Sequence, residues 1–251
     1  MIQTIVNADD FGMSENVNQA ICLCFEKRII TNTTLMVNMP YANDAVILAK
    51  EHGFAERVGL HLNLTAGTPL TMKIRSNRLF CDSNGNFNAK FHLSTSKRLH
   101  IGKEEAEAVR EEIEAQIRRY LAFGLPEKHM DSHHHAHTDM SVFHELAPLL
   151  HKYGFKSMRI SRNMYEKTSV FNSCYKKLYN GKVKRLRLKT ADYFGSFHDF
   201  SAYFDKLPEN ALVEIMLHPM FSEEWRLMDT NVPMSLVKSF MDSKNLMLHA
   251  Y

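Results

Sequence analysis

Apolar residues in this chain fall into short runs separated by longer segments of a different spacing. The short runs are rich in β-branched and other apolar residues, which is typical of buried strands. They cover residues 4–6, 33–38, 58–64, 129–133, 157–160 and 212–217, and 246–249 could add a terminal strand. In the longer segments apolar residues recur every three or four positions, which predicts amphipathic helices over 14–28, 41–51, 103–123 and 142–153.

Strands that alternate with helices imply an α/β fold with a parallel sheet and right-handed crossovers. An open doubly wound sheet and a barrel both fit this order. Polar residues at the C-terminal ends of several strands favour a distorted (β/α) barrel of the TIM type. No internal repeat or low-complexity linker divides the chain, so we expect a single domain over 1–251. Segments 65–102 and 161–190 lack a clear period and are predicted to be loop excursions, the second partly helical.

Composition narrows the classes of function. The chain has 251 residues, 45% of them hydrophobic, and a formal net charge of +3. Such a small excess of positive charge does not favour nucleic acid or a membrane as a partner, and we expect neither. The basic run 182–189 and the acidic residues of 104–114 are interpreted as solvated faces, with an anion-binding patch as the alternative for the basic run.

Cysteine usage and the N-terminus point to a reducing compartment. The four cysteines form no CxxC pair, so neither a disulfide framework nor a thiolate metal site is indicated. The chain has no run of 18 apolar residues, and its first residues lack the basic start and apolar core of a signal peptide. We therefore expect a cytoplasmic protein.

Four polar clusters lie at or just beyond the ends of predicted strands. They are Asp9-Asp10 in NADDFG, His61 in GLHLNLT, the run HMDSHHHAH over 129–137, and His218 in EIMLHP. The C-terminal ends of parallel strands share one face of an α/β fold. We therefore expect the four clusters to converge, although more than 200 residues separate the first from the last.

The residue types in these clusters suit a hydrolytic metal site. Two adjacent carboxylates after a strand cannot point the same way, so one can bind a cation while the other acts as a base. Two imidazoles and one carboxylate leave coordination positions open for water and substrate. A cation lowers the pKa of water, a free carboxylate can take the proton, and a separate histidine can protonate a leaving group. The residues that supply these parts are Asp9, Asp10, His61, His133 and His218.

The run 129–137 holds five of the 14 histidines. The residues that would share one face of an extended strand are His129, Asp131, His133, His135 and His137, with His134 on the other face. A strand rises about 3.3 Å per residue, so one cation cannot contact all of them. One or two should be ligands, and the others should orient ligands or contact substrate. The individual roles of His134, His135 and His137 are left open.

Each cluster alone has a plainer interpretation. His61 can be a hydrogen-bonded core residue, the two aspartates can cap the following turn, and His218 can simply end a strand. Dense imidazole at a strand end has no comparable structural explanation, so the four clusters together favour a functional site.

At these residues the sequence resembles the YdjC-like carbohydrate deacetylase family, which includes chitooligosaccharide deacetylases. The matching motifs are NADDFGMS at 7–14, GLHLNLTAGTPL at 59–70, HMDSHHHAH at 129–137 and EIMLHP at 214–219. They are spread over nearly the whole chain. One departure is Met220, where the family often has glycine after His-Pro. It bears on the local loop shape and the fit of the substrate, and not on the role of His218.

The resemblance implies a distorted (β/α) barrel, a Mg²⁺ or Zn²⁺ site and a homodimer. It implies Asp10, His61 and His133 as metal ligands, Asp9 as general base and His218 as general acid. The reaction implied is removal of the acetyl group from an acetylated amino sugar such as a chitooligosaccharide or diacetylchitobiose.

Two rival functions remain at this stage. A metal-dependent phosphoesterase could use the same ligands, although it would normally need a second metal and more carboxylates at the strand ends. A metal-binding or sugar-binding protein without catalysis would keep the histidines but would not need Asp9 or His218.

Overall fold

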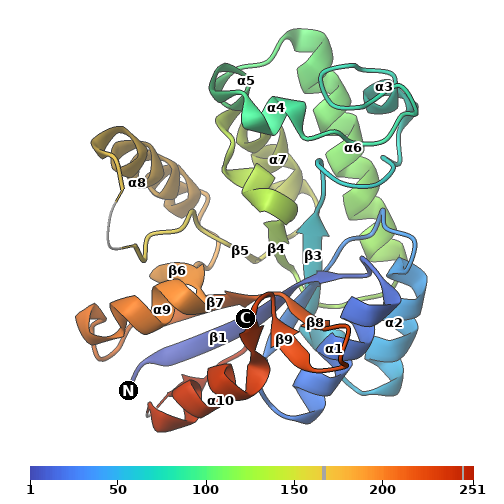
Figure 1. Cartoon of the computed structure of the whole chain (residues 1–251). Coiled ribbons are helices and arrows are strands. Elements are labelled where there is room, and N and C mark those ends of the chain that lie inside the picture. The colour runs from blue at the N-terminus through green and yellow to red at the C-terminus, as the bar shows by residue number, and fades with distance from the viewer. Residues whose placement is uncertain (166–167, 245) are drawn as a thin grey trace.

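A curved parallel sheet forms the centre of the molecule in the computed structural model, which describes residues 1–165, 168–244 and 246–251 (Figure 1). Its strand order is β5-β4-β3-β2-β1-β7-β6. The strands are β1 (Gln3–Phe11), β2 (Asn32–Leu35), β3 (Val58–Leu62), β4 (His129–Ser132), β5 (Ser157–Met158), β6 (Tyr193–Ser196) and β7 (Leu212–Leu217). The sheet curls into a half-barrel with helices around it, which confirms the predicted α/β class and the distorted TIM-like barrel.

The distortion of the barrel lies between β5 and β6. Among the described residues these two strands share no ladder, so the sheet does not close there. β5 is only two residues long and cannot support a continuous pairing on both sides. The short strand β11 (Met247–Leu248) pairs in parallel with Gln3 and Thr4 at the N-terminal end of β1, as the apolar run near the C-terminus predicted.

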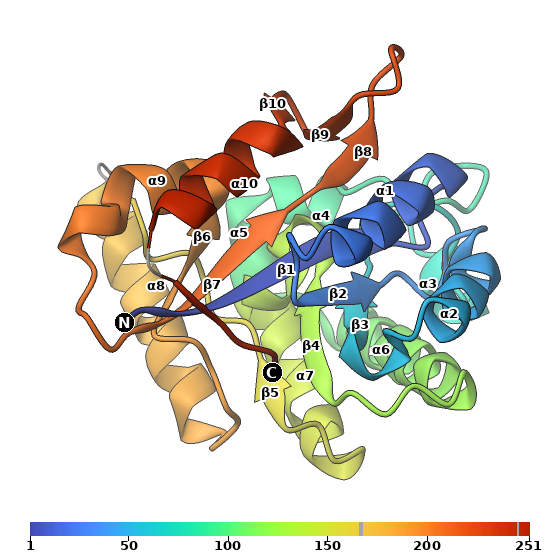
Figure 2. The same ribbon diagram turned by 90° about the horizontal axis from the view of Figure 1, so that it is seen from below.

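Long helices cover the outer surface of the sheet (Figure 2). They are α1 (Glu15–Glu26), α2 (Ala42–Glu51), α6 (Lys103–Ala122), α7 (Met140–Lys152), α8 (Val170–Arg185) and α10 (Met234–Ser243), with the shorter α9 (Phe197–Tyr203). The predicted cap of the first helix is present, because the Ser14 side chain accepts a hydrogen bond from the Val17 N–H. None of the helices that the structure describes has both the length and the apolar character needed to cross a membrane. All four cysteines are free thiols.

Several elements have no clear signal in the sequence. A small antiparallel sheet follows β7, in the order β10 (Val232–Pro233), β9 (Leu227–Asp229) and β8 (Pro219–Phe221), and its β8–β9 hairpin projects from the body in Figure 2. Strands of two or three residues are too short to show a hydrophobic period. The segment 161–190 contains α8, a longer helix than we expected for an excursion.

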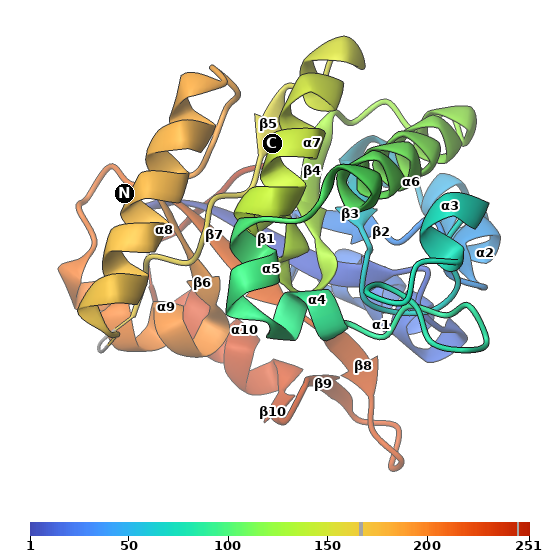
Figure 3. The same cartoon turned by 90° about the horizontal axis from the view of Figure 1, so that it is seen from above.

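The segment 65–102 leaves the sheet after β3 and returns before α6. It contains three short helices, α3 (Met72–Arg75), α4 (Lys90–Leu93) and α5 (Thr95–Leu99), which are visible together in Figure 3. Helices of four or five residues show no period, which is why the sequence predicted only a loop. Because α4 lies beside the site described below, this segment helps to shape it.

A buried carboxylate anchors this segment to α6. Glu112 is fully buried, and its two oxygens accept hydrogen bonds from the Leu70 N–H at 3.0 Å, the Thr71 N–H at 2.8 Å and the Thr71 hydroxyl at 2.9 Å. The interpretation of every acidic residue in 104–114 as solvated is therefore wrong for Glu112. The error arises because backbone donors some 40 residues away satisfy this carboxylate, and a local pattern cannot show them.

We expect Glu112→Ala to lower the free energy of unfolding by about 2–4 kcal/mol, because it leaves buried N–H donors without acceptors. The matched control is Glu111→Ala, which removes the same charge from the next residue on an exposed position and should cost less than about 0.5 kcal/mol. Urea denaturation of the two variants and the unchanged protein measures the difference. Equal losses for the two variants would show that Glu112 does not anchor the segment.

Candidate functional site: a metal centre at the strand ends

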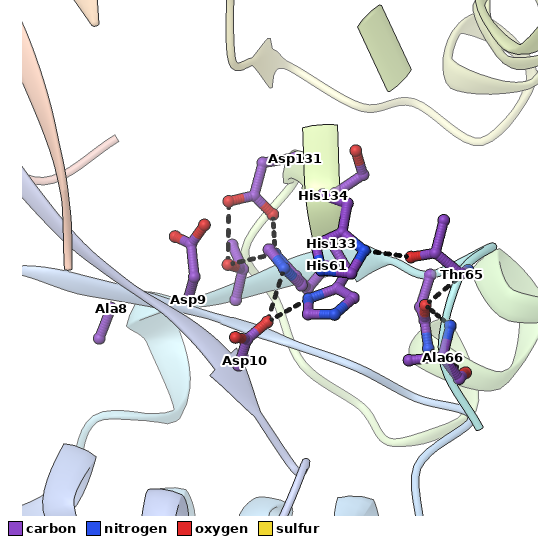
Figure 4. Close-up of polar contacts among 12 residues, drawn as sticks. Ala8, Asp9, Asp10, His61, Thr65, Ala66, Asp131, His133 and His134 are labelled. Atoms are coloured by element: carbon purple, nitrogen blue, oxygen red, sulfur yellow. Dashed lines mark hydrogen bonds and ion pairs between the residues drawn. The ribbon is translucent and has the colours of Figure 1, made fainter. Parts of the chain in front are cut away.

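The end of β1 separates the two adjacent carboxylates. Over residues 8–11, β1 carries one more residue than β2 does over 33–35, which is a β-bulge. Asp10 has a φ of 69°, in the left-handed region that aspartate tolerates better than most residues. As a result Asp9 contacts Arg159. Asp10 instead contacts two histidines, His61 and His133 (Figure 4). The prediction that the two carboxylates diverge is confirmed.

Asp10, His61 and His133 form one buried cluster. The Oδ1 atom of Asp10 lies 2.7 Å from Nδ1 of His133 and 3.1 Å from Nε2 of His61. One ligand atom from each residue lies within 4.8 Å of the others, so the group could hold a metal ion. Burial alone would raise the pKa of Asp10, but hydrogen bonds from the two histidines hold it well below its usual value. Asp10 is therefore ionised at neutral pH.

Asp131 orients the His61 ring. The two residues are neighbours in register on β3 and β4, and His61 Nδ1 lies 2.6 Å from Asp131 Oδ1. Nδ1 thus donates to a carboxylate while Nε2 faces Asp10, an arrangement typical of metal-binding histidines. Burial lowers the pKa of His61, but Asp131 and the other nearby carboxylates raise it to about 10. A cation that binds His61 must therefore displace a proton.

A fully buried arginine contacts three carboxyl groups beneath the cluster. Arg159, just after β5, contacts both oxygens of Asp9 at 2.7 Å, Asp131 Oδ2 at 2.8 Å and Glu214 Oε1 at 2.5 Å. The centroid of the Phe194 ring lies 4.6 Å from the guanidinium carbon, so the ring covers one side of the guanidinium. Burial alone would raise the pKa of Asp9, but Arg159 holds it below its usual value, with smaller contributions from nearby histidines. Asp9 is thus an ionised carboxylate in a fixed orientation.

Two other groups of residues have metal-ligand spacing. One combines Asp9 and Asp131 with His61, and the other combines Asp131 and Glu214 with His129. Both include carboxylates that already contact the Arg159 guanidinium, whose positive charge opposes a cation at the same place. Asp10 has no such contact with Arg159, so its cluster is the candidate metal centre.

All five residues singled out in the sequence line one cavity of about 630 Å³. Asp9 and Asp10 come from β1, His61 from β3, His133 from the segment after β4 and His218 from the segment after β7. The cavity also touches α4 through His92 and Leu93. Its size lies in the range of small-molecule sites. The predicted convergence is therefore observed, whereas the individual roles stay predictions.

His218 lies between β7 and β8 and is partly exposed to the cavity. Its backbone N–H donates to Asp229 Oδ1 at 2.7 Å, and the Thr230 N–H donates to the His218 carbonyl at 3.2 Å. Burial raises the pKa of Asp229. These contacts hold the backbone at His218, and among the described residues its ring has no hydrogen-bond or ion-pair partner.

The histidine run does not continue as a strand. β4 ends at Ser132, and His134 and His135 have left-handed φ values of 50° and 56°. The prediction that His135 and His137 share a strand face with His129 and His133 is therefore wrong, because the alternation of faces stops at this turn. His134 and His135 line the cavity, whereas His137 is fully buried, with its Nδ1 2.5 Å from Ser132 Oγ.

Arg159 has no role among the sequence-based predictions. Asp131 lies in the histidine run, whose non-ligand members are expected to orient ligands or contact substrate, and its contact with His61 fits the first of these roles. Arg159 follows a short predicted strand, and a charged residue inside a run that is otherwise expected to be buried was a usable signal. Its carboxylate partners Asp9 and Glu214 lie 150 and 55 residues away, however, so no local pattern identifies them.

Comparison with known proteins shows the family of this chain. The sequence profile of a family described as YdjC-like protein matches residues 3–246. The chain belongs to this YdjC-like family. Its relatives include a protein of Thermoanaerobacter pseudethanolicus named carbohydrate deacetylase, which is 32% identical over 88% of this chain and 82% of its own. A Vibrio cholerae protein of the same name is 32% identical over 88% of this chain and 79% of its own.

A solved structure supports the fold of this YdjC-like chain. It is the crystal structure of a proposed cellobiose-phosphate cleavage protein from Enterococcus faecalis, with a TM-score of 0.73. The comparison covers 100% of this chain and 97% of the other, at 23% identity. At that identity the likeness shows a shared fold.

We expect Asp131→Asn to weaken divalent-cation binding by about 10–100-fold, because the His61 ring loses the carboxylate that orients it. Titration of the metal-stripped protein with Zn²⁺ in a calorimeter measures the affinity. Asp205→Asn, at an exposed position, is the matched control and should bind as the unchanged protein does. Unaltered affinity in a folded Asp131→Asn variant would remove Asp131 from the metal centre.

Proposed function

We propose that this protein is a metal-dependent hydrolase that removes the N-acetyl group from an acetylated amino sugar. The observation that carries the proposal is the single cavity that brings Asp10, His61 and His133 together with Asp9 and His218. The relatives named carbohydrate deacetylase support the reaction and the class of substrate. Chitooligosaccharides and diacetylchitobiose are the substrates that the family resemblance favours.

The donor set fits a divalent cation. Asp10, His61 and His133 offer one oxygen and two imidazole nitrogens, all buried and close together, and Asp131 orients one of the rings. Two imidazoles favour Zn²⁺ and related metals, whereas the resemblance favours Mg²⁺. When bound here, a cation would polarise the acetamide carbonyl and make water more acidic.

The chain's own residues would then perform the proton transfers. Asp9 is ionised, and Arg159 contacts both of its oxygens, so it is oriented to accept a proton from the attacking water. His218 lines the same cavity and would donate a proton to the departing amine nitrogen. The products would be acetate and the free amino sugar.

The phosphoesterase alternative has less support. It would need a second cation, and the carboxylates nearest the Asp10 cluster, Asp9 and Asp131, contact the Arg159 guanidinium instead. A protein without catalysis would not need an ionised Asp9 in the same cavity as His218. The cytoplasmic location and the homodimer stay predictions of the sequence.

The proposal is tested by acetate release from N-acetylglucosamine and its short chitin oligomers. The protein is stripped of metal, and each of several divalent cations is added back separately. We expect acetate release only with an added cation. No release from any of these sugars, in a protein that still binds the cation, would shift the assignment to a phosphoesterase or a binding protein.

Replacement of Asp9 by asparagine should separate metal binding from catalysis. We expect Asp9→Asn to bind the cation, because Asp10, His61 and His133 are unchanged, but to reduce kcat by about 10²–10⁴-fold. His133→Ala should lose cation binding and activity together. Calorimetry and acetate release on the same preparations provide the comparison, and full activity in Asp9→Asn would refute the general-base role.

A further inference from the structure

The cavity that holds the five site residues also has apolar residues in its wall. Among the described residues that line it, the apolar ones are Ala89, Leu93 and Met216. Leu93 on α4 is 81% exposed and Ala89, just before α4, is partly exposed, so both lie toward solvent. Met216 is only 6% exposed. Met216 therefore supplies the buried part of this apolar surface.

Met216 lies on β7 two residues before His218. Because side chains alternate along a strand, Met216 faces the same side as His218 and as the fully buried Glu214. Its register partner on β1 is Asn7, and Asp9 follows two residues later on that strand. Met216 is thus at the base of the cavity, beside the two residues to which the proposed function assigns the proton transfers.

The backbone at Met216 is held from both sides. β7 lies between β1 and β6, and Met216 is in register with Asn7 on one strand and with Ser196 on the other. The strand cannot shift without breaking one of these ladders. Only a change of the Met216 side chain itself could make more room at this position, and a close-packed interior opposes such a change.

The acyl carbon of an acetylated amino sugar carries four groups once water has attacked it. They are the original oxygen, the oxygen from water, the nitrogen and the methyl group. In the proposed function the original oxygen faces the Asp10 cluster, the water oxygen faces Asp9 and the nitrogen faces His218. The methyl group is the apolar one of the four, and it is stabilised by an apolar contact away from water.

We propose that Met216 contacts the methyl group of the acetyl substituent and limits the acyl group to that size. A propionyl group is longer by one methylene, which would need the space that the Met216 side chain occupies. One extra methylene in an apolar pocket commonly changes kcat/KM by about 10–200-fold. The proposal deepens the proposed function and rests on it, because it makes Met216 the residue that selects the acyl group.

The test compares N-acetyl and N-propionyl derivatives of glucosamine and of chitobiose with the cation-loaded protein. The rate of acetate or propionate release gives kcat/KM for each sugar. We expect the acetyl sugars to be preferred by about 10–100-fold, and Met216→Ala to lower this acetyl-to-propionyl ratio by about 10-fold or more. An unchanged ratio in a folded Met216→Ala variant would overturn the proposal.

Two further variants separate the acyl contact from a general loss of packing. Met241→Ala removes an equally buried methionine, also 6% exposed, from α10, where it does not line the cavity, and it should keep the ratio. Met216→Leu nearly conserves the volume of the side chain and should also keep the ratio. The same fall in Met241→Ala as in Met216→Ala would overturn the assignment to Met216.

A smaller change covers the case in which Met216→Ala does not fold. Met216→Val removes less volume from the core and should lower the acetyl-to-propionyl ratio in the same direction. An unchanged ratio in folded Met216→Val would count against the proposal as strongly as it would in Met216→Ala.

Direct binding keeps this proposal distinguishable from the proposed function. Calorimetric titration of the cation-loaded Asp9→Asn variant with each sugar measures affinity without fast turnover. If the acetyl sugar binds more tightly than the propionyl sugar and an added Met216→Ala substitution removes this preference, the acyl contact is confirmed even if the unchanged protein releases no acetate. If acetate is released but Met216→Ala alters neither ratio, the deacetylase activity stands and the acyl contact fails.

Discussion

The polar interior of this barrel depends on one buried guanidinium. Arg159 contacts three carboxylates that lie away from water, Asp9, Asp131 and Glu214. Buried charges of one sign are tolerated only when they are paired, and removal of one partner commonly costs about 3–5 kcal/mol. Arg159 positions Asp9 directly and His61 through Asp131. The same ion pairs that allow the polar core therefore also orient two residues of the candidate site.

The two adjacent aspartates acquire different surroundings from the backbone between them. The bulge in β1 and the left-handed φ of Asp10 send one carboxylate to an arginine and the other to two histidines. Because Asp9 contacts the Arg159 guanidinium, it is a poor place for a cation, whereas Asp10 has no contact with Arg159 and is the better candidate ligand. The base and the metal ligand of the proposed function would thus be neighbouring residues that a local change in backbone direction separates.

The sequence predicted the elements with a strong period and the site residues that follow them. The strand over 212–217 has the bounds of β7, and the helix predicted over 103–123 ends one residue from α6. Convergence of the strand-end clusters followed from the geometry of parallel sheets. The turn at His134 and the buried role of Glu112 could not be predicted, because each depends on backbone angles or distant partners that leave no local pattern. For the same reason the role of Arg159 could not be predicted, because its partners lie far from it in sequence.

The central claim is that a divalent cation binds Asp10, His61 and His133 while Arg159 occupies the neighbouring carboxylates. Anomalous diffraction from crystals soaked with Zn²⁺ tests it most directly. The account predicts a peak about 2.0–2.2 Å from a ligand atom of each of these three residues, with the contacts of Arg159 to Asp9 and Asp131 intact. A peak among His129, Asp131 and Glu214, or one that displaces Arg159 from Asp9, would contradict it.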